Sequence, residues 1–541
     1  MSQVRSIKQT RGKYDAIIIG GGHNGLVAAA YLAKAGKKTL VLERRRLVGG
    51  ATVTEEIYPG FRYTVFSYVV SLLRPDIIRD LQLPKHGLTV LPLESTLTPL
   101  PNGDYLYRDG DHFRTLRDIA RHSARDAGNY DDYSRSMYFM AKAVKYILSM
   151  MPPDPTSFNP NDWLDLLGMA RHLLGLGTEQ FYLLAKLMTM SAADFLGQWF
   201  ESDPLTGTMS ASGIIGTFLG PRSPGTAYVL LHHYMGEIDG AFRAWGFAKG
   251  GTGEIANAIA RSAESFGAEI RCSAPVAQVI VKNGRALGVA LENGDEIYAD
   301  VIGSSADPKC TFLQFVQPQE LPPELVESIH KFDSRGSSGK VNLALDTLPD
   351  LSCLPGPSHT GLKNRALAGA ISISPSVDYI ERAYDAAKYG EIPERPFIDT
   401  IIPSMIDPDM APPGKHVMSC FVQYAPYHLN GGWDENKREA FGDAVINTLA
   451  EYIPNLKDII LHRQVLTPVD IERIAGISQG NIFHGELSLS QLFFLRPAAG
   501  WAKYRTPIRG YYQCGSGTHP GGGIMGTPGQ FGAREMLKEL S

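Results

Sequence analysis

The fold of this chain is decided by residues 14–25, which read YDAIIIGGGHNG. The apolar run at the start of this stretch has the length and composition of a buried parallel strand. It leads directly into the pattern GxGxxG, and an alanine-rich segment over residues 26–35 follows. Gly36 then stands where a helix commonly ends on glycine. Strand, glycines and helix in this order predict the first βαβ unit of a dinucleotide-binding domain.

Each glycine of the motif has a physical task. Gly20 permits the tight turn, Gly22 lets backbone N–H groups approach a pyrophosphate, and Gly25 lets the helix pack closely on the strand. The helix N-terminus then offers unpaired donors and a positive dipole end to the phosphates. A second strand over residues 38–42 ends in Glu43, where an acid accepts hydrogen bonds from a ribose hydroxyl. Such an acid favours an unphosphorylated ribose, as in FAD or NAD.

The residues after Glu43 distinguish FAD from NAD. Arg44 and the double glycine Gly49-Gly50 follow the ribose acid, and this arrangement resembles FAD enzymes of the amine oxidase and phytoene desaturase superfamily. The resemblance implies that the backbone at Gly49 and Gly50 passes beside the ribityl and pyrophosphate region, and it makes Arg44 a cofactor-binding candidate. It also implies that the backbone of Val276 meets the adenine.

The densest motif lies near the C-terminus, where residues 514–526 read CGSGTHPGGGIMG and contain six glycines. Such backbone suits close packing against a flat ligand, because side chains would block the approach. The segment is similar to the C-terminal signature of bacterial-type phytoene desaturases. This similarity implies that the loop lies along the flavin, with cofactor contacts from four residues: Gly517, Gly522, Gly523 and Ile524.

His519, within this motif, is the candidate catalytic residue. An imidazole next to the flavin could polarise the ring or shuttle a proton, and a purely structural hydrogen bond is the alternative. The adjacent His232 and His233 are weaker candidates, because neighbouring side chains on one element point apart and do not form a joint metal site. His484 and Arg496 either face the substrate or hold the domains together, and the sequence leaves both options open.

The cofactor domain is predicted to be split along the chain. Its three pieces are residues 10–70, 245–310 and 500–541, and residues 71–244 and 311–499 form a substrate domain. The fold class is therefore α/β: a two-dinucleotide-binding (Rossmann-type) FAD domain with an inserted α+β substrate domain, as in phytoene desaturases and amine oxidases. The substrate domain contains apolar stretches that are expected to be helical, over residues 137–151 and 164–190.

Nearly the whole chain resembles the phytoene dehydrogenase-related FAD-dependent oxidoreductases. The resemblance implies hydride transfer between flavin and a small apolar substrate, polyene or lipid-like, in desaturation, saturation or isomerisation. A flavin amine oxidase-like enzyme is the first alternative and requires an aromatic cage beside the flavin. A non-catalytic FAD-binding interaction protein is the second. A disulfide reductase is excluded, because the five cysteines include no close pair and only one nucleotide-binding motif is present.

Composition and residue spacing restrict the possible partners and the cellular location of the protein. The net charge of -4 offers no polybasic field for nucleic acid, and the cysteine spacing predicts no metal site. Free thiols favour a reducing compartment, so we expect a cytoplasmic protein, or a mitochondrial one if the chain is eukaryotic. No apolar run is long enough to span a bilayer, which limits membrane contact to a peripheral patch. Residues 1–13, basic and without acids, are expected to form a solvated tail. Association into a homo-oligomer is compatible with the sequence, which does not decide it.

Overall fold

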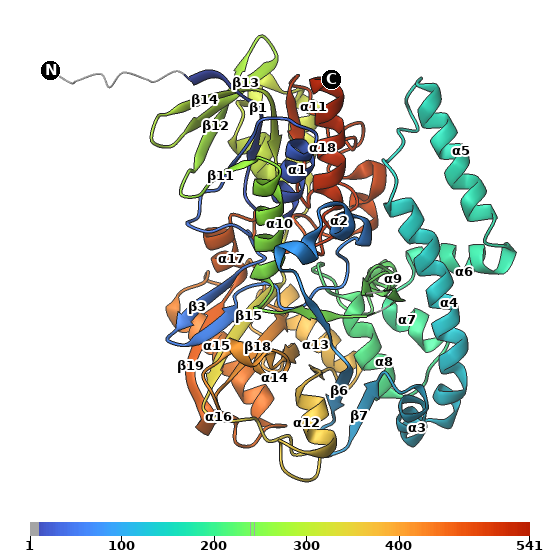
Figure 1. The fold of residues 1–541 in the computed structure, drawn as a ribbon. Coiled ribbons are helices and arrows are strands. Elements are labelled where there is room, and N and C mark those ends of the chain that lie inside the picture. The colour runs from blue at the N-terminus through green and yellow to red at the C-terminus, as the bar shows by residue number, and fades with distance from the viewer. Residues whose placement is uncertain (1–9, 239, 243) are drawn as a thin grey trace.

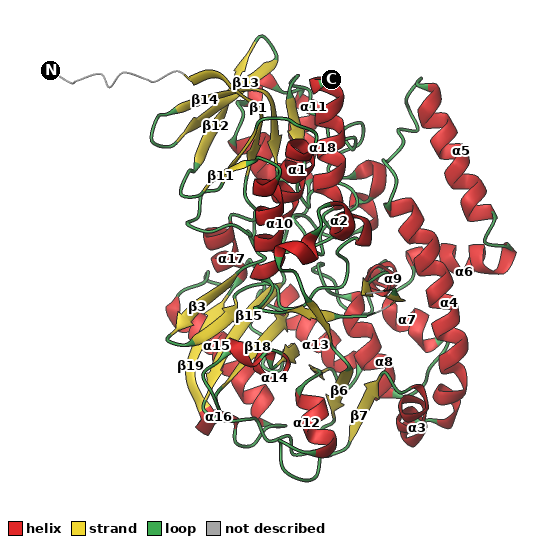
Figure 2. Cartoon of the chain, viewed as in Figure 1, coloured by secondary structure: helices red, strands yellow, loops and turns green. Residues whose placement is uncertain are grey.

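The computed structural model describes residues 10–238, 240–242 and 244–541, so that residues 1–9 of the expected tail lie outside the described residues. Two sheets form the body of the molecule, one above the other in the view of Figure 1, and a set of helices stands along one side. Figure 2 shows the same division, with strands concentrated in the two sheets and helices between and beside them.

The first sheet has seven strands in the order β11-β2-β1-β14-β13-β12, with β20 paired to β14. Strands β11, β2, β1, β14 and β20 run parallel, whereas β12 and β13 form an antiparallel extension on β14. The strands are β1 (Thr10–Ile19), β2 (Thr39–Leu42), β11 (Glu269–Arg271), β12 (Val276–Lys282), β13 (Arg285–Leu291), β14 (Glu296–Ser304) and β20 (Tyr511–Gln513). This is the predicted Rossmann-type sheet, assembled from three distant parts of the chain.

Three helices pack together on one face of this sheet: α1 (His23–Lys34), α10 (Gly253–Ser265) and α18 (Thr527–Leu540). On the other face lie η3 (Cys310–Gln314) and α11 (Pro323–Lys331), whose residues Phe312, Leu325 and Ile329 are buried in the same core as Ile17 of β1. Residues 311–331 therefore belong to the cofactor domain. The predicted boundary at residue 310 was wrong, because the apolar side of α11 is buried against the first sheet.

The second sheet also has seven strands, in the order β19-β15-β18-β17-β16-β6-β7. Neighbouring strands are antiparallel except for the parallel pair β16 and β6. They are β6 (Ser95–Pro99), β7 (Tyr105–Asp109), β15 (Ser338–Leu345), β16 (Ala370–Ile373), β17 (Phe397–Ile401), β18 (His416–Gln423) and β19 (Ile460–Leu466). Helix α15 (Glu435–Ala450) covers one face with Phe441 and Val445. The opposite face packs in part against Ile380 and Tyr384, and its residues Lys340 and Phe421 line a cavity.

The helices beside the sheets are α3 (His112–His122), α4 (Ala124–Leu148), α5 (Pro160–Leu174), α6 (Thr178–Thr189), α7 (Ala192–Gly197), α8 (Asp203–Ser210) and α9 (Thr226–Tyr234). The expected helical stretch over residues 164–190 is broken between α5 and α6, where Gly177 adopts a φ of 80°. Within α5 only Asp162 is buried, so most of this apolar helix lies open to solvent. Among the described residues, no helix combines the length and apolar character needed to cross a bilayer.

The remaining elements connect these layers. Hairpin β3–β4 contacts β18 of the second sheet through β4, and thereby joins the N-terminal piece to the substrate domain. The connecting elements are β3 (Thr54–Tyr58), β4 (Phe61–Thr64), α2 (Pro75–Asp80), β5 (Val90–Pro92), β8 (Glu237–Ile238), β9 (Ala241–Phe242), β10 (Gly246–Ala248), α12 (Gly361–Leu367), α13 (Val377–Lys388), α14 (Pro403–Ile406), α16 (Leu456–Ile459) and α17 (Pro468–Ala475).

Candidate active site

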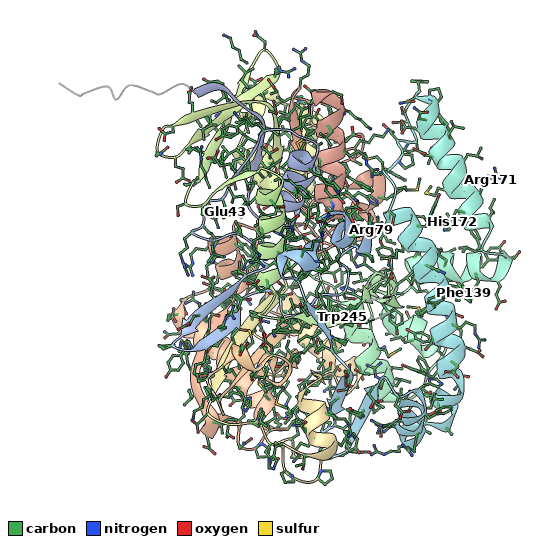
Figure 3. The ribbon with its side chains drawn as sticks, in the orientation of Figure 1. Glu43, Arg79, Phe139, Arg171, His172 and Trp245 are labelled. Carbon is green, nitrogen blue, oxygen red and sulfur yellow. The ribbon has the colours of Figure 1, made fainter. Side chains whose placement is uncertain are left out.

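A cavity of about 550 Å³ runs from the carboxyl end of the first sheet to the second sheet. This volume lies in the range of ligand sites in proteins. Figure 3 labels two of its lining residues, Glu43 after β2 and Trp245 nearer the second sheet, at separate levels of the molecule. The cavity therefore has a nucleotide end at the first sheet and a distal end at the second.

The nucleotide end is built by the glycine motif. Gly20 and Gly22 line the cavity, and no side chain caps the first turn of α1. A Cβ placed on Gly22 would meet nothing within 4 Å and would enter the space in front of this turn. A Cβ on Gly25 would lie 2.2 Å from the carbonyl oxygen of Gly20, which shows how closely α1 packs on β1. An open helix N-terminus beside bare backbone fits a pyrophosphate.

Glu43 and Arg44, both candidates for cofactor binding from the sequence, line the cavity. The Glu43 carboxylate accepts the backbone N–H of Gly21 at 2.7 Å and that of Arg45 at 2.8 Å. It therefore holds the phosphate loop, and a carboxylate keeps further acceptor capacity for a ribose hydroxyl. Arg44 donates to the carbonyl oxygen of Ile474 at 2.8 Å, which ties the loop after β2 to the end of α17.

The predicted backbone contacts lie along the same cavity. Gly49 and Gly50, with φ of 124° and 60°, both line it, and Gly49 pairs with Gly22 in an isolated β-bridge. Val276 lines it at the start of β12, beyond Glu43 on the nucleotide side. From the C-terminal motif, Gly523 and Ile524 reach the cavity. These positions leave a continuous strip of backbone on which a dinucleotide can lie.

The structure places three predicted site residues away from the cavity. Gly517 packs against Pro308, where a Cβ would approach the proline Cδ to 2.2 Å, and Gly522 packs against Phe483. The buried ring of His519 lies edge-on to Phe493 at 5.2 Å and beside the carbonyl groups that end α4. Burial lowers the pKa of His519 to about 3. The expected catalytic role of His519 finds no support, because its side chain faces a packed interior.

The four weaker candidates also divide into residues that line the cavity and residues that do not. His233 and His484 line the cavity, whereas His232 and Arg496 are buried outside it. His233 stacks on Trp245 with ring centroids 6.1 Å apart, and burial lowers its pKa to about 4. Burial likewise lowers the pKa of His484. These imidazoles are therefore neutral near neutral pH.

Sequence reasoning missed the residues at the distal end. Tyr68, Phe421 and Lys340 converge there, with the rings of Tyr68 and Phe421 stacked at 5.8 Å and the Lys340 Nζ 4.4 Å from the Tyr68 ring centroid. Burial lowers the pKa of Lys340 to about 7, and it raises the pKa of Asp399 to about 6. The alternation of residues 338–345 could have shown that Lys340 shares a strand face with Ser338 and Asn342.

Comparison with known proteins establishes the family of the chain. The family described as "Flavin containing amine oxidoreductase" matches residues 25–527. The chain belongs to this family. It is an FAD-dependent oxidoreductase, and the predicted resemblance to the phytoene desaturase-like branch is confirmed.

Three relatives show the range of the family. The chain is 39% identical to pyridine nucleotide-disulfide oxidoreductase domain-containing protein 2 of Rattus norvegicus, over 98% of this chain and 94% of the relative. It is 27% identical to a limonene dehydrogenase polypeptide of Castellaniella defragrans, over 97% and 95%. It is 26% identical to the chloroplastic prolycopene isomerase of Daucus carota, over 95% and 78%. The solved structure of putrescine oxidase bound to putrescine shares the fold, with a TM-score of 0.61, 17% identity and coverage of 97% and 99%.

Gly22→Val tests the phosphate end of the site. The backbone at Gly22 is extended, with φ of -67° and ψ of 163°, so valine fits the conformation while its side chain fills the pyrophosphate space. We expect folded protein that retains about a tenth or less of the wild-type FAD, measured by absorbance after acid release. Gly168→Val on α5 is the matched control, since a Cβ there also meets nothing within 4 Å. Full FAD content in Gly22→Val would place the pyrophosphate elsewhere.

Proposed function

We propose that this protein oxidises an apolar, polyene or lipid-like molecule by transfer of hydride to FAD. The observation that carries the proposal is the chemistry of the distal wall. Besides Lys340, the neutral His233 and the three serines Ser67, Ser71 and Ser338, the wall is apolar or aromatic: Tyr68, Val69, Leu72, Ile215, Trp245, Phe421, Ile482 and Phe483. A wall of this kind binds a hydrocarbon chain by removing its surface from water.

The residues of the chain supply binding and environment. FAD, when bound, supplies the two-electron acceptor for the hydride. The buried rings of Tyr68 and Phe421 and the ring of Trp245 orient an extended chain and exclude water from it. Aromatic faces also favour the positive charge that develops on a carbon skeleton as hydride departs.

Oxidation of an amine is supported less well. A protonated amine needs an acidic or carbonyl partner, and the acids that line the cavity within the described residues are Glu43, Glu292 and Glu472. Glu43 holds the phosphate loop, Glu292 donates its backbone N–H to Pro275 beside Val276, and Glu472 accepts from Tyr427 at 2.5 Å. None of these carboxylates shares the distal wall with Lys340, and the nearby Asp399 accepts the Tyr68 hydroxyl and does not line the cavity, so an ammonium group at this wall meets another amine.

The names of the relatives support the proposal in part. Limonene dehydrogenase and prolycopene isomerase carry the names of apolar terpenoid molecules, which agrees with an apolar substrate. The name of the rat relative refers to disulfide oxidoreduction, and the five cysteines of this chain are all free in the structure. We therefore propose carbon oxidation and not thiol chemistry.

We further propose that helices α4–α6 contact an uncharged lipid surface from which the substrate enters. The exposed large apolar residues there are Tyr138, Phe139, Tyr146, Phe158, Trp163, Leu164, Leu167, Leu174 and Tyr182. In Figure 3, Phe139 and Arg171 mark this outer side. Leu72 lines both the main cavity and a small pocket of about 20 Å³ that reaches Leu148 of α4, so this pocket lies between the main cavity and the helices. Amphipathic aromatic residues favour the membrane interface.

The reaction is tested by anaerobic incubation of the FAD-loaded protein with carotenoid, retinoid and unsaturated fatty-acid pools. We expect one pool to bleach the flavin while a component loses two hydrogen atoms, followed by absorbance and mass spectrometry. Unchanged mass with a shifted double bond would indicate isomerisation. The Gly22→Val protein serves as the flavin-depleted control. Bleaching by primary amines alone, with no response to any of the three pools, would refute the proposal.

The lipid contact is tested by flotation with phosphatidylcholine vesicles. Wild-type protein should float, and Leu167→Asp should float several-fold less, because a charge on this face opposes insertion. Phe113→Ser is the matched control, since Phe113 is 81% exposed but lies on α3. Equal flotation of wild type and Leu167→Asp, or none of either, would rule out contact through α5.

A further inference from the structure

His484 stands at a strained position in the wall of the cavity. Its backbone φ is 59°, in the left-handed region that residues other than glycine seldom adopt. The Asn481 side chain holds this turn, because its amide oxygen accepts the backbone N–H groups of Phe483 at 2.9 Å and Gly485 at 3.2 Å. Arg496 donates to the carbonyl oxygens of the same two residues. Strained residues that are held this firmly are commonly found at binding sites.

The same guanidinium connects this turn to the start of α1. Arg496 also donates to the carbonyl oxygen of Ser516 at 3.1 Å, and the Ser516 hydroxyl accepts from the side chain of Asn24 at 2.9 Å. Asn24 follows His23, the first residue of α1. His484 in turn lowers the pKa of His23, so the two imidazoles are near enough for their charges to interact. Both imidazoles therefore lie at the nucleotide end of the cavity.

Both rings line the cavity and contain nitrogens without partners. Among the described residues, the buried atoms Nε2 of His23 and Nδ1 of His484 make no hydrogen bond. The other nitrogen of His23, Nδ1, lies 3.5 Å from the hydroxyl of Thr52. Because a buried polar atom is costly without a partner, these imidazoles are suited to a polar ligand.

The other basic residues that line the cavity do not supply a charge at this end. Arg44 donates to the carbonyl oxygens of Arg473 at 3.1 Å and Ile474 at 2.8 Å, in the last turn of α17. Lys340 and His233 lie at the distal wall. The pyrophosphate of FAD is a dianion, and the helix end of α1 offers only a partial positive charge. Within the described residues, the two imidazoles are therefore the groups of the cavity wall that remain to balance it.

Without an anion, both imidazoles are neutral near neutral pH. Burial lowers the pKa of His23 to about 3, and His484 acts in the same direction. Burial also lowers the pKa of His484, which Asp307 opposes and Arg496 reinforces. An anion in contact with the rings favours their charged form. Because a charge on one ring disfavours a charge on the other, we expect the pair to take up about one proton and not two.

We propose that His23 and His484 together bind the pyrophosphate of FAD, as the cationic partner that an arginine would otherwise supply. This inference goes beyond the proposed function, because it concerns how the protein holds its cofactor and applies to any substrate. One imidazole comes from the start of α1 and the other from the strained turn, so the bound pyrophosphate connects these two distant segments.

The assignment is tested by calorimetric titration of the FAD-depleted full-length protein with FAD. His484→Asn keeps a residue that tolerates the left-handed backbone, and it removes the imidazole. We expect FAD affinity near pH 6 to fall about 10- to 100-fold in His484→Asn and in His23→Gln, as for loss of a hydrogen bond to a charged group. His359→Gln is the matched control, since His359 is exposed and does not line the cavity.

Proton uptake separates this role from packing. Wild-type FAD affinity should fall by up to about tenfold per pH unit between about pH 6 and about pH 8, because the bound pair holds a proton that the free pair lacks. Titrations in buffers of different ionisation enthalpy should show uptake of about one proton near pH 6. Both the proton uptake and the pH dependence should be lost in the double variant His23→Gln, His484→Asn.

Riboflavin provides the ligand control, because it contains the flavin ring but no phosphate. Its affinity should be independent of pH and equal in wild type and both single variants. His484→Gly, which also suits the left-handed backbone, replaces His484→Asn if that variant does not fold.

Three results would overturn the assignment. One is wild-type FAD affinity in both single variants at every pH. Another is an equal loss of affinity for FAD and riboflavin, since the imidazoles would then serve the ring or the turn. The third is FAD binding by the wild type without proton uptake. None of these measurements depends on turnover, so they stand apart from the test of the proposed reaction.

Discussion

The structure depends on the close contact between the carbonyl oxygen of Gly20 and the first turn of α1 at Gly25. A Cβ at Gly25 would lie 2.2 Å from that oxygen and 2.8 Å from the Ser305 hydroxyl, so no side chain can be placed there without separating helix and strand. Ser305 follows β14 and donates to the carbonyl oxygens of Ile19 and Gly20. One contact thus aligns β1, α1 and β14, and it directs the uncapped helix end at the space where a pyrophosphate fits.

A second constraint is the buried side chain of Arg496, which fixes one wall of the cavity. The guanidinium of Arg496 is fully buried and donates to five carbonyl oxygens, from Phe483, Gly485, Glu486, Gln491 and Ser516. Five charge-assisted bonds compensate for burial of the cation. Burial nevertheless lowers its pKa to about 10. Because Phe483 and Ser516 both line the cavity, this arginine fixes the wall that joins the substrate domain to the C-terminal glycine-rich loop.

The sequence was most informative where function depends on local backbone. Gly22 and Glu43 could be predicted because their spacing along one βαβ unit has a single structural meaning, whereas Gly49 was predicted from the resemblance to FAD enzymes. His519 could not be placed in this way, since a glycine-rich loop indicates close backbone approach but not the direction of a side chain. Lys340 was missed because strand alternation does not distinguish a face toward solvent from a face toward a cavity. That distinction depends on α15 covering the other face, a contact between distant segments.

We infer that the cavity holds a dinucleotide at one end and a substrate at the other. The most direct test is to identify and quantify the flavin released by acid from purified wild-type protein, using absorbance and mass spectrometry. We expect one FAD per chain, because the strip from Gly22 to Val276 provides for both phosphate and adenosine. Release of FMN, of a nicotinamide dinucleotide, or of no flavin from folded protein would contradict it.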